Sequence, residues 1–120
     1  MENIIITRKR SIAAFLAKYY CVLNLDKEKF QEQIGLRDTL SLGYRNQFLN
    51  ESTQTFPIAN GETISIEISE KKNTLFVVAF TLGGNIFSNE ITFNKGSLDL
   101  SYSIKTKLGF TSNTLILSKV

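Results

Sequence analysis

The second half of the chain alternates between apolar and polar positions in short segments that turn residues separate. In the segment 63–69, isoleucine stands at every second position, with Thr, Ser or Glu between. Successive side chains of a strand point to opposite faces of a sheet, so this alternation predicts a half-buried strand. Residues 75–80 are apolar on both faces and predict a central strand. We expect Phe76, Val78 and Phe80 to be buried against the isoleucines or against the facing sheet.

Turn sequences divide this half of the chain into further strands. Asn60-Gly61 is a strong hairpin signal, because the tightest hairpin turns favour positive φ at their central positions. Pro57 cannot donate to an interior ladder, so residues 56–58 predict an edge strand. Turns are also expected at 70–73, 83–85 and 94–96, and the remaining strands at 86–93, 98–104 and 115–117.

The first 25 residues predict two more strands with a basic connection between them. Residues 4–7 are β-branched throughout, which suits a pleated and half-buried surface. Residues 19–25 alternate, with the odd-numbered positions forming one apolar face. Residues 8–11 would then end the first strand and begin the connection.

A basic cluster followed by an apolar run is also found in secretory signals and membrane anchors. Here, however, Ile4-Ile5-Ile6 precedes the charges, and Lys18 interrupts the apolar run that follows them. A spanning helix needs about 20 apolar residues, and the sequence contains no such segment. We therefore expect no cleavable signal and no transmembrane segment, and a cytoplasmic protein in preference to an exported one.

One helix is predicted after the first two strands, over about residues 27–34. Asp26 can cap its N-terminus, and Leu25 can pack on Phe30 at the spacing of a hydrophobic staple. Gly35 can provide the left-handed residue at which the helix ends.

Short alternating strands with turns about every 8–12 residues are typical of an antiparallel sandwich or barrel. We predict a single all-β domain over residues 1–120, an antiparallel β-sandwich of about seven or eight strands. A helix-containing insertion at about 26–54 would follow the second strand. Within it, residues 36–54 fit neither the helical nor the strand period.

Composition agrees with this fold and limits the chemistry. Hydrophobic residues make up 42% of the chain and charged residues 21%, which is typical of a globular protein. The single cysteine excludes an internal disulfide. The absence of histidine removes Ser-His and Cys-His catalysis and most zinc sites. The sequence has no nucleotide-binding or calcium loop, so we predict no cofactor, metal or catalytic residue.

Carboxylate pairs are the remaining route to catalysis. Glu67 could meet Glu70 across strands, and glycoside hydrolysis needs only two carboxyl groups. Asp99 could likewise meet Glu90. Acidic residues that point to solvent from strands usually form a hydrated face, so we expect no enzyme. Cys21, the only thiol, is expected to be buried and structural.

Charge is uneven along the chain. Residues 1–45 hold eight Lys and Arg against five Asp and Glu, whereas residues 46–120 hold six of each, so the net charge of +3 arises in the first part. A surplus of three does not indicate a nucleic-acid binder without a motif. The basic residues either are solvated turn residues or form a surface for an anionic partner: a cell-wall polymer, a lipid headgroup, an acidic protein or, less expected, a nucleic acid. This candidate surface comprises Arg8, Lys9, Arg10, Lys18, Arg37 and Arg45.

Several short motifs carry a resemblance to known proteins. They are Ile6-Thr7-Arg8-Lys9-Arg10-Ser11, Tyr-Cys-Val-Leu at 20–23, Asn60-Gly61-Glu62 and Ser88-Asn89-Glu90-Ile91. On these motifs the chain, apart from residues 26–54, resembles small uncharacterised β-sandwich proteins of Gram-positive bacteria. It is also similar to the sandwich modules fused to bacterial envelope proteins. The resemblance implies a sandwich fold and transfers no activity or functional residue.

The sequence therefore predicts a non-enzymatic binding or protein-interaction module, with a protein or an anionic polymer as partner. One alternative is a small carboxylate-dependent hydrolase. Another is a self-associating structural protein, a homo-oligomer joined through an edge strand near residues 56–58 or through the last strand.

Overall fold

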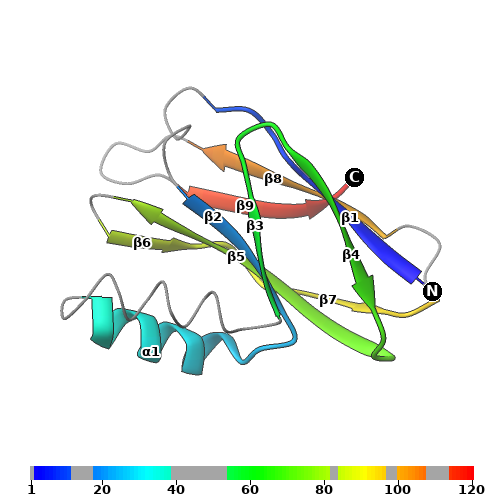
Figure 1. Cartoon of the computed structure of the whole chain (residues 1–120), viewed down its shortest axis with the longest axis horizontal. Helices are drawn as coiled ribbons and strands as arrows, with labels where there is room; N and C mark the ends of the chain where they lie inside the picture. The colour runs from blue at the N-terminus through cyan, green and yellow to red at the C-terminus, as the bar shows by residue number, and fades with distance from the viewer. Residues whose placement is uncertain (1, 12–17, 39–53, 82–83, 97–99, 108–113) are drawn as a thin grey trace.

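A computed structural model describes residues 2–11, 18–38, 54–81, 84–96, 100–107 and 114–120, with the backbone alone for residues 33–38, 81 and 84 (Figure 1). The described elements, in chain order, are β1 (Glu2–Arg8), β2 (Lys18–Leu23), α1 (Lys27–Asp38), β3 (Thr55–Ile58), β4 (Thr63–Ile68), β5 (Lys72–Thr81), β6 (Gly84–Phe87), β7 (Ile91–Asn94), β8 (Ser101–Lys107) and β9 (Thr114–Lys119).

The described strands form two sheets that pack face to face, which confirms the predicted all-β sandwich. One sheet has four strands in the order β4-β1-β8-β9. The other has five, in the order β3-β2-β5-β6, with β7 also paired to β5. The described pairs are antiparallel except β1 and β8, which are parallel, so the sandwich is not purely antiparallel. Parallel neighbours need a long crossover, and here the chain passes through the other sheet between β1 and β8.

The main hydrophobic core lies between the two sheets. Ile4 and Ile6 of β1 are buried in it, because alternate positions of a strand point to the same face. Leu75 and Val77 of β5 belong to the same cluster from the opposite sheet. The isoleucine alternation of residues 63–69 is confirmed by Ile66 and Ile68, which are buried in this cluster.

A second, smaller core lies on the outer face of the five-stranded sheet. Phe76, Val78 and Phe80 are buried there with Phe30 of α1, whose ring lies edge-on to that of Phe76 at 5.4 Å between centroids. These three residues are therefore buried as predicted, but under the helix and not against the facing sheet. Burial on both faces of β5 could be predicted from its composition, whereas the layer that covers each face could not.

Helix α1 begins where the sequence predicts. The backbone N–H of Lys29 donates to Oδ1 of Asp26 at 3.0 Å, which is the expected N-cap. The helix continues through Gly35 to Asp38, four residues beyond its predicted end. A glycine in a helix interior costs only about 1 kcal/mol, so it does not by itself end a helix.

The segment 86–93, predicted as one strand, is divided by a β-bulge. Strand β6 pairs with β5 so that Phe87 lies opposite Val78. Strand β7 pairs with the same edge of β5 so that Ile91 lies opposite Leu75. Two residues of β5 therefore face three residues of the partner, which is the arrangement of a one-residue bulge.

The turn at Asn60-Gly61 joins the two sheets and does not close a hairpin. Gly61 adopts the expected positive φ, of 79°. However, β3 lies in the five-stranded sheet and β4 in the four-stranded sheet, so the predicted hairpin was wrong. The side chain of Asn60 exchanges two hydrogen bonds with the backbone of Ser11, at 2.9 and 3.3 Å. Local turn chemistry does not determine whether the flanking strands pair with each other.

Candidate functional site

The three consecutive basic residues of the opening segment occupy different environments. Arg8 is only 1% exposed, so the expectation that it projects into solvent was wrong. Lys9 and Arg10 are exposed. The Arg10 side chain lies beside Gly61, where a Cβ would be 3.4 Å from the Arg10 Nε. The three side chains therefore do not form one surface.

The other predicted basic residues do not complete that surface in the described part of the chain. Lys18 is exposed and pairs with Phe80 of the outer core, which places it on the outer face of the five-stranded sheet. Arg37 belongs to α1, but its side chain is outside the described residues. Arg45 lies outside them altogether.

Arg8 has a structural environment at the boundary of the main core. Its Nη1 donates to the backbone oxygen of Ile58 at 3.0 Å. Its guanidinium carbon lies 3.4 Å from the centroid of the Tyr19 ring, a cation–π contact. Desolvation by burial lowers the pKa of Arg8, and the interaction with Tyr19 partly opposes this. The contacts join β1 to β2 and β3, so Arg8 links the two sheets.

A different basic group forms on the outer face of the four-stranded sheet. The backbone N–H of Lys9 donates to the oxygen of Ile104 at 2.9 Å, which extends the β1–β8 ladder by one residue. Lys9 therefore lies level with Lys105, on strands about 4.8 Å apart. Lys107 is two residues further along β8 and points to the same face. All three side chains are exposed, and we call them the lysine cluster.

A row of hydroxyl groups crosses the same face one step nearer the centre of the sheet. The strand registers align one hydroxyl residue from each of the four strands. The hydroxyls of Thr7 and Thr63 are 2.9 Å apart and hydrogen-bonded to each other. We call this set the hydroxyl row, and it consists of Thr63, Thr7, Ser103 and Ser118.

The acidic residues of the four-stranded sheet do not oppose the lysine cluster directly. Glu67 pairs with Asn3, six residues from Lys9 along β1, which corresponds to about 20 Å. This separation exceeds the physiological Debye length of about 8 Å. Glu62 is nearer, but its Oε1 accepts a hydrogen bond from the backbone of Ala59 at 2.9 Å, within the turn. The Glu62 carboxylate keeps its charge, but the three lysines of the cluster outnumber it.

Sequence reasoning found Lys9 but missed its two neighbours. The alternation of residues 101–107 could have placed Lys105 and Lys107 on one face of a strand. Their position beside Lys9 depends on the parallel pairing of β1 with β8, which links residues about a hundred positions apart. No local signal in the sequence indicates this pairing.

Cys21 is confirmed as a buried residue of the main core. Desolvation by burial raises the pKa of its thiol to about 12. A thiol in this state is protonated at neutral pH and is a poor nucleophile. Its position therefore supports a packing role.

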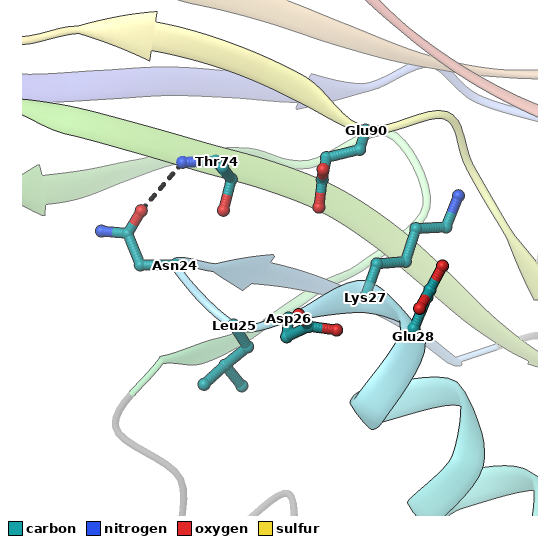
Figure 2. Close-up of a pocket in the computed structure, with 7 residues that line it drawn as sticks. All are labelled: Asn24, Leu25, Asp26, Lys27, Glu28, Thr74 and Glu90. Atoms are coloured by element: carbon teal, nitrogen blue, oxygen red, sulfur yellow. Dashed lines mark hydrogen bonds between the residues drawn. The ribbon is translucent and has the colours of Figure 1, made fainter.

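An open hollow of about 490 Å³ lies at the start of α1 (Figure 2). Several of its polar groups are engaged in the fold: Asn24 Oδ1 accepts from the backbone of Thr74 at 2.8 Å, and Lys27 Nζ donates to the oxygen of Ser88 at 2.7 Å. Its acidic groups are Glu28 and Glu90, together with the helix-capping aspartate. The residues that line it are Asn24, Leu25, Asp26, Lys27, Glu28, Thr74 and Glu90.

The structure describes three of the four carboxylates that were considered for a hydrolase. Glu67 and Glu70 are both exposed, on β4 and in the turn after it. Glu90 lines the hollow, and Asp99 is outside the described residues. Among the residues that the structure describes, no group of three His, Cys, Asp or Glu side chains is arranged to hold a metal ion. No helix in the described ranges is long and apolar enough to cross a membrane.

The fold and these surfaces define a two-sheet sandwich with a helix on one outer face and a lysine cluster on the other. Comparisons with protein-family models, with curated proteins and with solved structures find no match for this chain. A functional proposal for this chain therefore rests on its own surfaces.

Proposed function

We propose that this chain is a non-enzymatic binding module whose lysine cluster binds an anionic polymer. The observation that carries the proposal is the alignment of Lys9, Lys105 and Lys107 on neighbouring strands of one exposed face. In the adjacent hydroxyl row Ser103 is buried, and the exposed Thr63 and Ser118 offer hydrogen bonds to the same ligand. Lysine ammonium groups supply charge without fixed geometry, which suits a repeating anion more than a single shaped ligand.

The openness of this surface favours a polymer over a small anion. Exposed ion pairs contribute about 0–1 kcal/mol each, so a single phosphate would bind weakly to side chains in full contact with water. A polymer gains affinity because one chain makes several contacts at once and releases several counterions. We propose the cytoplasm as the location, and a relationship to the small β-sandwich proteins of Gram-positive bacteria. Polyphosphate and acidic protein segments then become the partner classes to test.

The first prediction concerns charge removal from this cluster. The triple change Lys9→Gln, Lys105→Gln and Lys107→Gln should weaken binding to long-chain polyphosphate about tenfold or more. For the unchanged protein, binding through three contacts should fall roughly 20- to 40-fold between about 50 and 200 mM salt. Fluorescence titration at both salt concentrations measures both effects. Poly-glutamate, tested in parallel, distinguishes an acidic protein from a phosphate polymer.

A matched control separates this surface from general basicity. Lys18, Lys29 and Lys71 are also exposed but lie apart, on β2, on α1 and in the turn before β5, and the same triple change to Gln there gives the same net charge. The control should bind polyphosphate within about twofold of the unchanged protein, because it leaves the cluster intact. Equal losses in the two variants, or negligible binding by all three proteins to both polymers, would reject the proposal.

A further inference from the structure

The outer edge of β4 presents a row of backbone groups. The backbone N–H of Arg8 donates to the oxygen of Glu62 at 2.9 Å, just before β4 begins. In an antiparallel ladder, alternate residues direct both backbone groups to the same neighbour. The even-numbered residues of β4 therefore face β1, and Thr63, Ser65 and Glu67 direct their N–H and C=O groups to the opposite side. β4 is the terminal strand of its sheet, and no other described strand pairs with that side.

The edge at the other end of the same sheet is blocked. The last backbone bond of the β8–β9 ladder, from Val120 to Ser101, shows that the odd-numbered residues of β9 face outward. Leu117 is the central one of these. Its N–H donates to Asn89 Oδ1 and its oxygen accepts from Asn89 Nδ2, both at 2.9 Å. A side chain thus occupies the centre of this edge.

The edges of the five-stranded sheet are also interrupted. In β3, the bond from Leu23 to Gln54 sets the register, so that Pro57 faces outward and offers no N–H. On the far side, the bulge at Ser88 divides β6 from β7. Proline and bulges are standard protections of strand edges against further pairing. Among the described edges, β4 has neither, and it carries a single charged residue, Glu67.

We propose that the outer edge of β4 pairs with β4 of a second copy of this chain. A strand added there must place apolar side chains over the core and polar ones on the outer face. β4 itself has this pattern, because Ile66 and Ile68 are buried whereas Thr63, Ser65 and Glu67 are exposed. A two-fold axis then creates one continuous sheet of eight strands from two identical surfaces.

The backbone directions also select the register of the pair. With the axis at Ser65, Ser65 lies opposite its own counterpart, and Thr63 lies opposite Glu67 of the second copy. The backbone N–H and C=O groups of all three residues point away from β1, so each opposed pair exchanges two hydrogen bonds. A shift of the axis by one residue loses one of these pairs. This register also avoids placing the two Glu67 carboxylates opposite each other.

Apolar side chains from both sheets add contact at the same edge of the sandwich. Phe56 on β3 and Ile64 on β4 pack against the main core but remain partly exposed, each on the edge strand of its sheet. Pairing of two β4 strands brings the corresponding edges of the two sandwiches together. The remaining apolar surface of these residues would then be covered.

Cross-linking tests the register directly. Ser65→Cys puts a thiol at the proposed axis, and a short bismaleimide should join two copies in high yield, because native Cys21 is buried and does not compete. Ser118→Cys is the matched control, since Ser118 is also exposed on the outer face of the sheet, but on β9. Its two copies should not be cross-linked under the same conditions, although they still associate through β4. Equal cross-linking of both variants, or none at Ser65, would overturn the register.

Sedimentation of the unmodified protein tests the association itself. We expect a reversible monomer–dimer equilibrium that Ser65→Lys abolishes, because two lysines would then oppose each other at the axis. Ser118→Lys adds the same charge to the same face and should leave the equilibrium within about twofold. A monomer at every soluble concentration, or equal effects of both substitutions, would overturn the proposal. The triple glutamine variant of the lysine cluster should still dimerise, which keeps this test independent of polymer binding.

Discussion

At the scale of single residues, Arg8 places a cation at the boundary of the apolar core, where defined contacts hold it. Its guanidinium stacks on Tyr19, and the Tyr19 hydroxyl is held by Thr106 Oγ1 at 2.7 Å. Stacked cation–π pairs contribute about 0.5–2 kcal/mol, more when desolvated. A hydrogen bond to Ile58 adds to this. The long side chain therefore fills space in the core and also donates a hydrogen bond to a buried oxygen. An exposed arginine in a turn would do neither.

Arg8→Ala should lower the free energy of unfolding by about 2–4 kcal/mol, because it leaves a cavity and removes the donor to the Ile58 oxygen. Arg8→Met should cost less, since it restores apolar volume and avoids the desolvation of a charge. Lys9→Ala, next to it but exposed, should change stability by less than about 0.5 kcal/mol. Urea denaturation measures all three. Similar small effects at both positions would mean that Arg8 has no structural role.

Cys21 leads to a pH-dependent prediction. Burial raises the pKa of its thiol from 9.0 to about 12, so above pH 9 the unfolded chain loses a proton that the folded chain retains. This favours the unfolded state, and the thiol's contribution to stability, complete below pH 9, should fall by about 1.4 kcal/mol per pH unit up to 12. The free energy of unfolding is measured against pH for the unchanged protein and for Cys21→Ala. Subtracting one curve from the other removes the contributions of other groups, including Tyr102, whose pKa burial also raises. A difference that stays flat between pH 8 and 10.5 would contradict the buried, protonated thiol.

At the scale of elements, the bulge between β6 and β7 connects the two sheets. The Ser88 hydroxyl accepts from the backbone of Val77 at 2.8 Å and so replaces a ladder bond that the extra residue disrupts. The next residue, Asn89, is turned toward β9 and pairs with the backbone of Leu117. An amide side chain can imitate a backbone unit in this way because it carries one acceptor and two donors. The two edges are thereby joined without a ladder between strands.

Asn89→Ala should destabilise the protein by about 1–2 kcal/mol, because it removes two hydrogen bonds and exposes backbone groups of Leu117. Asn3→Ala is the control: its bond to the Ser65 hydroxyl is exposed, and its loss should cost less than about 0.5 kcal/mol. Thermal unfolding followed by circular dichroism distinguishes the two. Equal melting temperatures would show that the Asn89 bonds do not contribute to stability.

At the scale of the whole molecule, the sequence predicted individual strands well and their pairing poorly. Alternation along 63–69 and 115–117 placed individual strands, because one buried face imposes a period of two. Capping chemistry placed the start of α1. The sheet to which each strand belongs depends on pairing between distant segments, and neither turn residues nor periodicity records this. The same limit explains the candidate site: Lys9 was found locally, whereas its neighbours on β8 required the parallel β1–β8 pairing.

The pairing of Asn89 with Leu117 has a consequence for how many partners the molecule can have. Among the described edges β4 alone is open to a further strand, so each copy has one such binding edge and assembly through β4 ends at two copies. Loss of the Asn89 amide would open the centre of the β9 edge and give each copy a second binding edge. Copies joined alternately through β4 and β9 would then extend in a row without an end point. On this view, one amide side chain sets the difference between a finite assembly and an unlimited fibre.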